Sequence, residues 1–308
     1  MADPTPPVVA QAEAPETTET TVRTLGRDAW HDLVRKPTFV VSAVLFVFFV
    51  TIAIAPGLFT SLSPTDCDLA LSRQGPSSAA WFGYDNNGCD VYTHTIYGAR
   101  ASIMVGVLTA IGVLLIGGIT GTIAGFYGRA TDTVVSRLGD IFFGIPLLLG
   151  ALIVLVSFPG GADTPELVTI SKVVLALAAL GWPQIMRITR SSVLQVRSAD
   201  YVQAARALGA GGVRMILKHI VPNSIAPVIV VATIAIGGYI AAEATLSFLG
   251  VGLQPPVVSW GLAISRAQDY VRTSPHMLLF PASALSLCVL AFIMLGDAIR
   301  DALDPKLR

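Results

Sequence analysis

Six long runs of apolar residues follow one another along the chain, separated by polar segments. A helix that crosses a bilayer needs about 20 consecutive, mostly apolar residues. Runs that meet this standard occupy residues 38–58, 101–126, 134–156, 168–186, 225–246 and 278–298. They are longer and more apolar than the core helix of a soluble domain needs to be. The pattern therefore predicts an all-α integral membrane protein with six transmembrane helices.

The composition supports this class. Of the 308 residues, 53% are hydrophobic and 13% are charged, whereas soluble domains carry about 25% charged residues. The formal net charge of +0 gives no reason to expect a nucleic-acid partner. The three cysteines are too few for a disulfide-rich scaffold, and they do not have the C-x-x-C spacing of a metal site.

The polar segments divide the chain into regions. Residues 1–22 are rich in Pro, Thr, Ala and Glu, and all their charges are acidic. A secretory signal peptide begins with basic residues instead. We expect a disordered tail, because this stretch buries too little apolar surface to offset the entropy of ordering it. A short segment at 23–37 leads to the transmembrane domain, 38–299, and residues 300–308 form a second tail.

Basic residues predict the orientation of the bundle. If the N-terminus is cytoplasmic, 15 of the 20 Lys and Arg residues fall on the cytoplasmic side and the other 5 fall outside. Cytoplasmic loops carry such an excess of positive charge. We therefore expect both termini in the cytoplasm, the long loop 60–98 outside and the polar insertion 196–222 inside.

This orientation places Cys67 and Cys89 in the outer loop, whereas Cys288 lies within the sixth apolar run. Disulfides persist on the outer side of a membrane because that compartment is oxidising. A bridge between Cys67 and Cys89 would pin the loop onto the bundle. Two free thiols are the alternative, since sequence spacing does not give the distance between the two Cα atoms.

Two features of the apolar runs predict how the helices pack. Gly117, Gly121 and Gly125 recur every four residues in the second run, and small residues on one helix face let a neighbouring backbone approach closely. Pro146 lies inside the third run and should kink or break that helix.

The insertion 196–222 is too polar to span a membrane, yet it has a helical pattern. Asp200 is a good N-cap, and Gln203 is placed to complete a capping box. A helix over 201–208 would carry a small apolar face, formed by Ala204, Ala205 and Leu208. Gly209 and the glycines after it should end this helix. A second amphipathic piece, 213–220, leads to the fifth run, so we expect a helix–turn–helix knob on the cytoplasmic face.

Parts of the insertion resemble the "EAA" loop of binding-protein-dependent ABC importer permeases. The resemblance rests on Gln203-Ala204-Ala205, Gly209 and Val221-Pro222. Gln203 stands where that family has Glu, and His219 and Val221 stand where Ile and Leu are usual. An amide keeps the capping role but loses the charge.

Further segments resemble peptide and nickel permeases, and most of all the "C" member of dipeptide and oligopeptide permease pairs. They are residues 82–91, 96–100, 241–252, 254–256, 259–261 and 300–305. Cys89 takes a position where those proteins commonly have Arg. The occurrence of these segments in this order indicates the permease family far more specifically than the EAA loop alone.

The resemblance implies the type I permease fold of ABC importers, with cytoplasmic coupling helices, in a bacterial cytoplasmic membrane. It implies a second homologous permease, two ATP-binding subunits and an extracytoplasmic substrate-binding protein as partners, with peptide as the substrate. ATP and magnesium would bind the partner subunits and not this chain. The residues expected to couple this chain to the ATP-binding subunit are Asp200, Gln203, Ala204, Ala205, Leu208 and Gly209.

Catalytic chemistry is missing from the sequence. None of the four lysines follows a glycine, so there is no Walker A loop, and neither H-E-x-x-H nor G-x-S-x-G occurs. The residues 85–90 do not fit the spacing of a calcium loop either. We expect a transport subunit and no enzyme. A nickel or other small-solute importer is the alternative within the family, and a secondary transporter or a scaffold is the alternative outside it.

Two ionisable residues lie within the predicted spans, where such groups are costly and often functional. Glu243 falls near the outer end of the fifth run. It either lines the substrate path or outer gate, or makes a structural hydrogen bond. Asp140 lies a few turns into the third run, where a salt bridge or a packing role is expected ahead of substrate contact.

Overall fold

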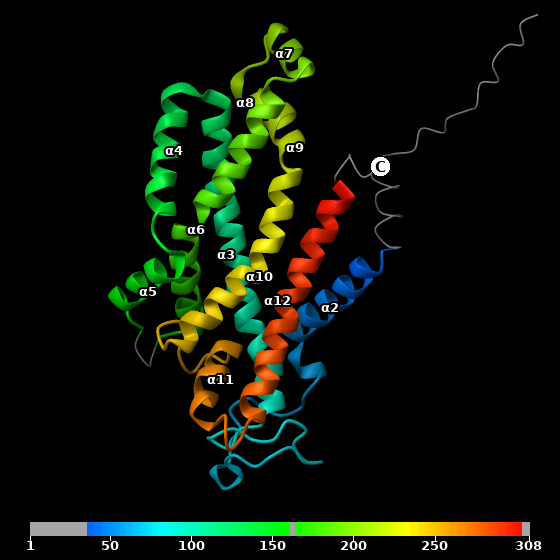
Figure 1. Ribbon diagram of the computed structural model, residues 1–308, viewed down its shortest axis with the longest axis vertical. Coiled ribbons are helices and arrows are strands. Elements are labelled where there is room, and N and C mark those ends of the chain that lie inside the picture. Colours follow the sequence, from blue (N-terminus) through cyan, green and yellow to red (C-terminus); the bar gives the residue numbers. More distant parts are fainter. Residues whose placement is uncertain (1–35, 161–163, 304–308) are drawn as a thin grey trace, which may run out of the picture.

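The computed structural model describes residues 36–160 and 164–303. The tail predicted at 1–22, nearly all of segment 23–37 and residues 304–308 of the tail predicted at 300–308 lie outside the described residues, whereas residues 300–303 are helical. Seven longer helices form the body of the molecule (Figure 1). They are α2 (Pro37–Ile54), α3 (Val91–Tyr127), α4 (Arg129–Phe143), α5 (Leu147–Ser157), α6 (Glu166–Arg197), α10 (Ala226–Phe248) and α12 (His276–Leu303).

Short elements complete the described chain. At one end of the bundle are α7 (Asp200–Ala207), α8 (Gly212–Met215), the π-helical turn η3 (Ile216–Ile220) and α9 (Val221–Ser224). At the other end are η1 (Pro56–Leu58), η2 (Leu69–Leu71), α11 (Trp260–Ala267) and η4 (Gln268–Tyr270). The outer loop is shorter than predicted, because the Asp90 side chain accepts a hydrogen bond from the Thr93 amide and so starts α3 at Val91.

Six crossings of the membrane follow from the directions of the helices. Five described helices are each long and apolar enough to span, and α4 with α5 forms a sixth, bent unit. A Cβ on Gly112 would lie 3.1 Å from the Ala178 Cβ, and one on Gly125 would lie 2.8 Å from Val193 Cγ1. Helices α3 and α6 therefore run parallel, and α4 and α5 together must return the chain across the bundle.

The third span is broken at Pro146. Helix α4 ends at Phe143, α5 begins at Leu147, and their axes differ by 81°. Proline has no backbone N–H and clashes with the carbonyl four residues earlier, so it favours a kink or a break in a helix. The break predicted at this proline is confirmed, but residues 134–156 do not form one straight helix. In Figure 1, α5 leaves the side of the bundle at a steep angle to α4.

The glycine stripe packs as predicted. At Gly117 a Cβ would come 2.6 Å from the Trp182 carbonyl oxygen, and at Gly121 it would come 2.5 Å from that of Met186. Real Cβ atoms do not approach a backbone oxygen so closely, so only glycine allows α3 and α6 to touch here. The two helices form the centre of the bundle.

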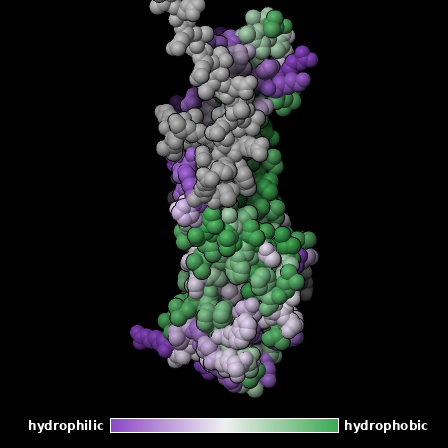
Figure 2. Space-filling view, turned by 90° about the vertical axis from the view of Figure 1, so that its right-hand side faces the viewer, coloured by the Kyte–Doolittle hydropathy of each residue, from purple (hydrophilic) through white to green (hydrophobic). Residues whose placement is uncertain are grey.

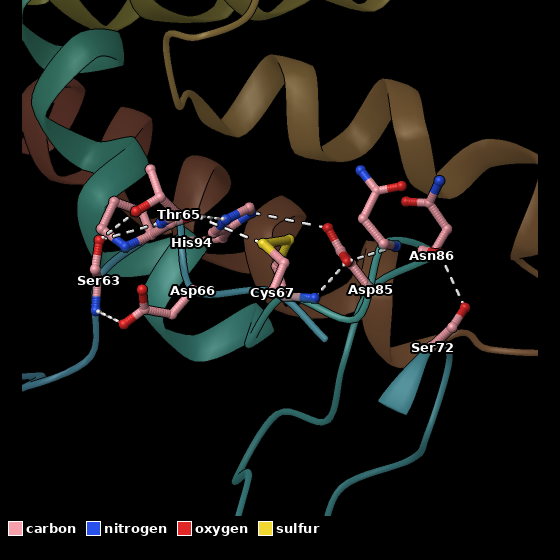
Figure 3. The surroundings of a disulfide bond; sticks show 11 residues. Ser63, Thr65, Asp66, Cys67, Ser72, Asp85, Asn86 and His94 are labelled. Atoms are coloured by element: carbon pink, nitrogen blue, oxygen red, sulfur yellow. Dashed lines mark hydrogen bonds and ion pairs between the residues drawn. A yellow bond between two sulfur atoms is a disulfide. The ribbon is translucent and has the colours of Figure 1, made fainter. Parts of the chain in front are cut away.

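The outer loop is tied down by a disulfide bond between Cys67 and Cys89 (Figure 3). Asp85 Oδ1 accepts hydrogen bonds from the amides of Asn87 and Cys89, each at 2.8 Å. His94 Nε2 lies 2.8 Å from the Pro64 carbonyl oxygen, which joins the start of the loop to α3. The third cysteine, Cys288, is a buried free thiol in α12.

Apolar and polar side chains occupy separate parts of the surface, as a membrane protein requires. On the face shown in Figure 2, hydrophobic side chains cover the helices in the middle of the molecule, and polar side chains gather at both ends. Lys36 Nζ lies 3.4 Å from the Asp301 carboxylate, so α2 starts and α12 finishes at the same end of the bundle. Helix α7 stands at that end too (Figure 1).

Candidate functional site

The knob formed by α7, α8 and η3 projects beyond the ends of α6 and α9 (Figure 1). Helix α6 continues past Met186 to Arg197, well beyond the predicted span, and it carries the chain out to the knob. The helix–turn–helix expected for 196–222 is present. Its turn contains Gly209, whose φ of +83° is strained for any residue with a side chain.

A small core fixes the knob to the bundle. Val202 of α7 is fully buried against Val193 of α6, Met215 of α8 and Ile220 of η3. Phe126 of α3 borders the same cluster. Sequence reasoning passed over Val202, although it is the one large aliphatic residue in the first turn of α7. Because this valine is anchored, α7 is oriented as part of a rigid unit and is not a loose loop.

The opposite face of α7 is open. Ala204 is exposed and Ala205 is partly so. Leu208 has 88% of its surface exposed. Of the apolar face predicted here, Ala204 and Leu208 are therefore open, whereas Ala205 packs partly against the core around Val202.

The predicted N-cap is wrong. Ala199 caps α7, and Asp200 is the first residue of the helix, where its negative charge favours the helix N-terminus. Gln203 does not form a capping box either. Its Nε2 donates to the Arg197 carbonyl oxygen at 2.9 Å and so ties α7 to the last turn of α6. An ionised glutamate has no proton to donate in this bond, so the amide has its own structural use here.

The knob is connected to α10 without a loop. Helix α8, the π-turn η3 and helix α9 follow one another directly, and Ile225 alone separates α9 from α10. His219 lies in η3 and Val221 starts α9. The backbone between the knob and α10 is therefore helical except at Ile225.

Glu243 is fully buried at the outer end of α10. Its Oε1 accepts a hydrogen bond from Ser247 Oγ at 2.7 Å, and Ser247 Oγ in turn accepts from the Leu253 amide at 2.9 Å. The hydroxyls of Ser102 and Ser259 also face the carboxyl group. Within the described chain, the other carboxylate oxygen, Oε2, accepts no hydrogen bond.

Helix α11 covers this carboxyl group. A Cβ on Gly261 would lie 2.7 Å from the Ala244 Cα, so α11 rests directly on α10. Trp260 is buried, and its Nε1 donates to the Thr95 carbonyl oxygen of α3 at 2.8 Å. Its backbone N–H donates to Ser102 Oγ at 3.3 Å. Glu243 thus holds together α3, α10 and α11 and does not face an open surface.

We predict that replacing Glu243 separates a hydrogen-bonding role from a role of its charge. Glu243→Gln keeps an acceptor for Ser247 and should change the free energy of unfolding little. Glu243→Ala leaves the buried Ser247 O–H without its acceptor, which costs about 1–3 kcal/mol. Reversible unfolding in mixed micelles measures both. Equal losses in the two variants would show that the carboxyl group itself is required.

Two ion pairs join α4 to α6. Arg187 Nη2 lies 2.8 Å from Asp140 Oδ1, as the salt bridge expected for Asp140 requires. Arg190 forms a two-pronged pair with Asp132, in which Nη2 lies 2.7 Å from Oδ2. The order of these pairs along the two helices shows that α4 runs antiparallel to α6.

One group of potential metal ligands occurs in the described chain, formed by Cys67, Cys89 and His94, whose ligand atoms lie within 4.8 Å of one another. The two sulfur atoms are bonded to each other, so neither is a thiolate that could bind an ion. These three residues fasten the outer loop to the bundle.

Comparisons with known proteins give a consistent family. Residues 117–308 match the family model "Binding-protein-dependent transport system inner membrane component", and residues 24–76 match "N-terminal TM domain of oligopeptide transport permease C". The dipeptide transport system permease protein DppC of Alkalihalophilus pseudofirmus is 38% identical over 283 residues, which cover 92% of this chain and 90% of the relative. The glutathione transport system permease protein GsiD of Pectobacterium atrosepticum is 33% identical over 298 residues, 96% of each chain.

Solved structures share the fold at lower identity. A chain of the inward-facing MetNI methionine ABC transporter has a TM-score of 0.53 and 18% identity, and the match covers 68% of this chain and 96% of that one. A chain of an amino acid ABC transporter has a TM-score of 0.50, again at 18% identity, over 67% of this chain and 92% of that one. With the family model covering more than half of its length, the chain belongs to the inner membrane components of binding-protein-dependent transport systems.

Proposed function

We propose that this protein is one of two permease subunits of an ATP-driven importer of short peptides. The observation that carries the proposal is the knob, which presents the exposed Leu208 at one end of the bundle and is joined to α10 by short helices with only Ile225 between α9 and α10. Relatives named as dipeptide, oligopeptide and glutathione permeases support peptide as the substrate class. Nickel or another small solute is the second candidate.

The chain needs partner proteins because it lacks the residues that bind ATP. Without a phosphate-binding loop it must take its energy from ATP-binding subunits, which would hold ATP and magnesium. A homologous permease supplies the other half of the path, and an extracytoplasmic binding protein delivers the peptide. We place the chain in a bacterial cytoplasmic membrane, with both termini and the knob in the cytoplasm, because most of the basic residues fall on that side.

Coupling would occur through the open face of α7. We assign contact with the ATP-binding subunit to Ala204, Leu208 and the Gly209 turn, and Ala205 supports this face from the core of the knob. Asp200 and Gln203 orient the helix from its first turn. Closure of the ATP-binding subunits would push the knob, and α10 would tilt with it, which gives alternating access of the path to the two sides. Glu243 would act on the outer gate by holding α11 on α10, not by touching the substrate.

Co-purification combined with transport tests this function. Tagged protein extracted in mild detergent should bring down a second permease and ATP-binding subunits. Proteoliposomes containing this complex should accumulate a labelled dipeptide only with ATP inside and the binding protein outside. Capture of this chain alone, together with uptake driven by an ion gradient, would identify a secondary transporter. Uptake of nickel ions and not of dipeptide would leave the coupling scheme intact and change the substrate class.

A further inference from the structure

A cavity of about 500 Å³ lies in the bend between α4 and α5. Phe142 and Pro146 line it on the side of the break, Gln184 lines it from α6, Tyr239 from α10 and Ile293 from α12. Four membrane-crossing units therefore contribute to one cavity, and most of its walls are apolar.

The cavity lies near the middle of the membrane. Tyr239 is about 20 Å from Ala226 and about 14 Å from Phe248 along α10, at 1.5 Å per residue. A span of this length matches a hydrocarbon core about 30 Å thick. A Cβ on Gly181 would lie 2.6 Å from the Tyr239 hydroxyl, so this part of α6 is at the same depth. Gln184 is one helical turn further toward the knob.

Two polar groups in the cavity have no partner. Throughout residues 36–160 and 164–303, no hydrogen bond is formed by the Gln184 amide or the Tyr239 hydroxyl. Gln184 is exposed. Lipid chains offer no hydrogen bonds, so unpaired polar groups at this depth face water or a polar molecule. Each of these two groups both donates and accepts, as the N–H and C=O groups of a peptide require.

A half-exposed ion pair lies beside the cavity on the same helices. The side chains of Arg187 and Asp140 are 45% and 52% exposed. The Arg187 guanidinium also lies 4.1 Å above the Phe143 ring. Arg187 is about 9 Å from Gly181 along α6 and so still lies within the depth of the hydrocarbon core. Charged side chains at this depth face a bundle interior or a water-filled path.

Resting on the function proposed above, we propose that this cavity and the adjoining Arg187–Asp140 pair form the wall of the translocation path in this subunit, where Gln184 and Tyr239 hydrogen-bond the backbone amides of a passing peptide. Recognition of the backbone suits a carrier of varied sequences, because every peptide has these groups. The apolar walls accept side chains of different shape. With two uncharged hydrogen-bonding groups, and with Arg187 and Asp140 paired to each other, the site holds a peptide weakly enough to release it.

Water access to a cysteine at position 184 tests the assignment. The complete complex carrying Gln184→Cys is placed in lipid nanodiscs and treated with a charged, membrane-impermeant thiol reagent. Leu175→Cys is the matched control, because Leu175 is 68% exposed on the same helix. It lies nine residues away and therefore on the opposite face. The parent protein gives the background, since Cys67 and Cys89 are bonded and Cys288 is buried.

We expect Gln184→Cys to react at least about 10-fold faster than Leu175→Cys, the gap between a water-filled path and a lipid-covered face. The dipeptide carried by the complex should slow the reaction. A Gln184→Cys variant that stays unreactive with and without ATP would overturn the inference. Proteoliposomes of the parent complex, assayed for uptake, distinguish this from failure of the proposed function, because there the parent itself would not import peptide.

A second variant keeps the test decisive if the cysteine protein does not assemble. Tyr239→Phe removes one hydroxyl and keeps the ring. Loss of one hydrogen bond worth about 1 kcal/mol corresponds to about 5-fold slower dipeptide uptake at saturating binding protein. Phe142→Leu is the control, because it changes an apolar wall of the same cavity without removing a hydrogen-bonding group. Undiminished uptake by Tyr239→Phe would contradict the assignment.

Discussion

A charge at the tip of the knob should abolish transport. In Leu208→Glu the folded chain loses no contact of its own, because Leu208 is 88% exposed. In the assembled importer, however, the carboxylate would be buried against the ATP-binding subunit. Changes at the centre of an interface commonly cost 2 kcal/mol or more, which weakens binding by about 30-fold or more. We expect capture of the ATP-binding subunit and ATP-driven uptake to fall to background.

The same substitution on the other side of the membrane provides the control. Leu69 is 74% exposed in η2, so Leu69→Glu adds an equal charge to an equally open leucine far from the knob. This variant should retain the ATP-binding subunit. Leu208→Met should also retain it, because an apolar side chain of similar volume is restored. If Leu208→Glu bound the ATP-binding subunit as the parent does, coupling through α7 would be refuted.

The spans could be predicted because lipid leaves few alternatives to a long apolar helix. The six runs correspond to α2, α3, the α4–α5 pair, α6, α10 and α12. The ends of these helices were less predictable. Helix α6 extends to Arg197 because its last turns stand in water, where polar residues suit a helix as well as apolar ones do. Hydropathy marks the part of a helix that lies in the membrane, and not the whole helix.

The angle of the break at Pro146 could not be read from the sequence. Proline favours a kink or a break, yet α6 continues through Pro183, and the 81° between α4 and α5 depends on what each piece packs against. The ion pairs of Asp132 and Asp140 hold α4 along α6. The glycine stripe, by contrast, was predictable, because spacing alone places Gly117, Gly121 and Gly125 on one face.

The sequence predicted where the candidate site lies better than it predicted what each of its residues does. The insertion was identified as a knob, yet the N-cap shifted by one residue to Ala199, and Gln203 bonds to α6. Capping rules describe an isolated helix start, whereas here the end of α6 offers a carbonyl oxygen that competes for the amide. The sequence placed Glu243 at the outer end of α10. It did not show that α11 covers this residue, because the cover depends on contacts between residues more than 150 positions apart, such as Trp260 with Ser102.

The close contact between α3 and α6 predicts opposite effects of the same small change at two neighbouring glycines. A Cβ at Gly121 would lie 2.5 Å from the Met186 carbonyl oxygen and 2.8 Å from the Thr189 Cβ, so Gly121→Ala must push the two backbones apart. Overpacking of this kind costs about 1–3 kcal/mol. The whole interface should loosen, because both helices are rigid. Reversible unfolding in mixed micelles should show the loss.

Gly118 provides the control on the same helix. A Cβ there meets nothing within 4 Å, so Gly118→Ala adds a methyl group without a clash. Alanine is the better helix former by about 0.5–1 kcal/mol, and the variant should be as stable as the parent or slightly more so. Equal stability of the two variants would mean that α3 and α6 are not in backbone contact at Gly121. A loss at Gly121 alone locates the contact on the one face of α3 that packs against α6.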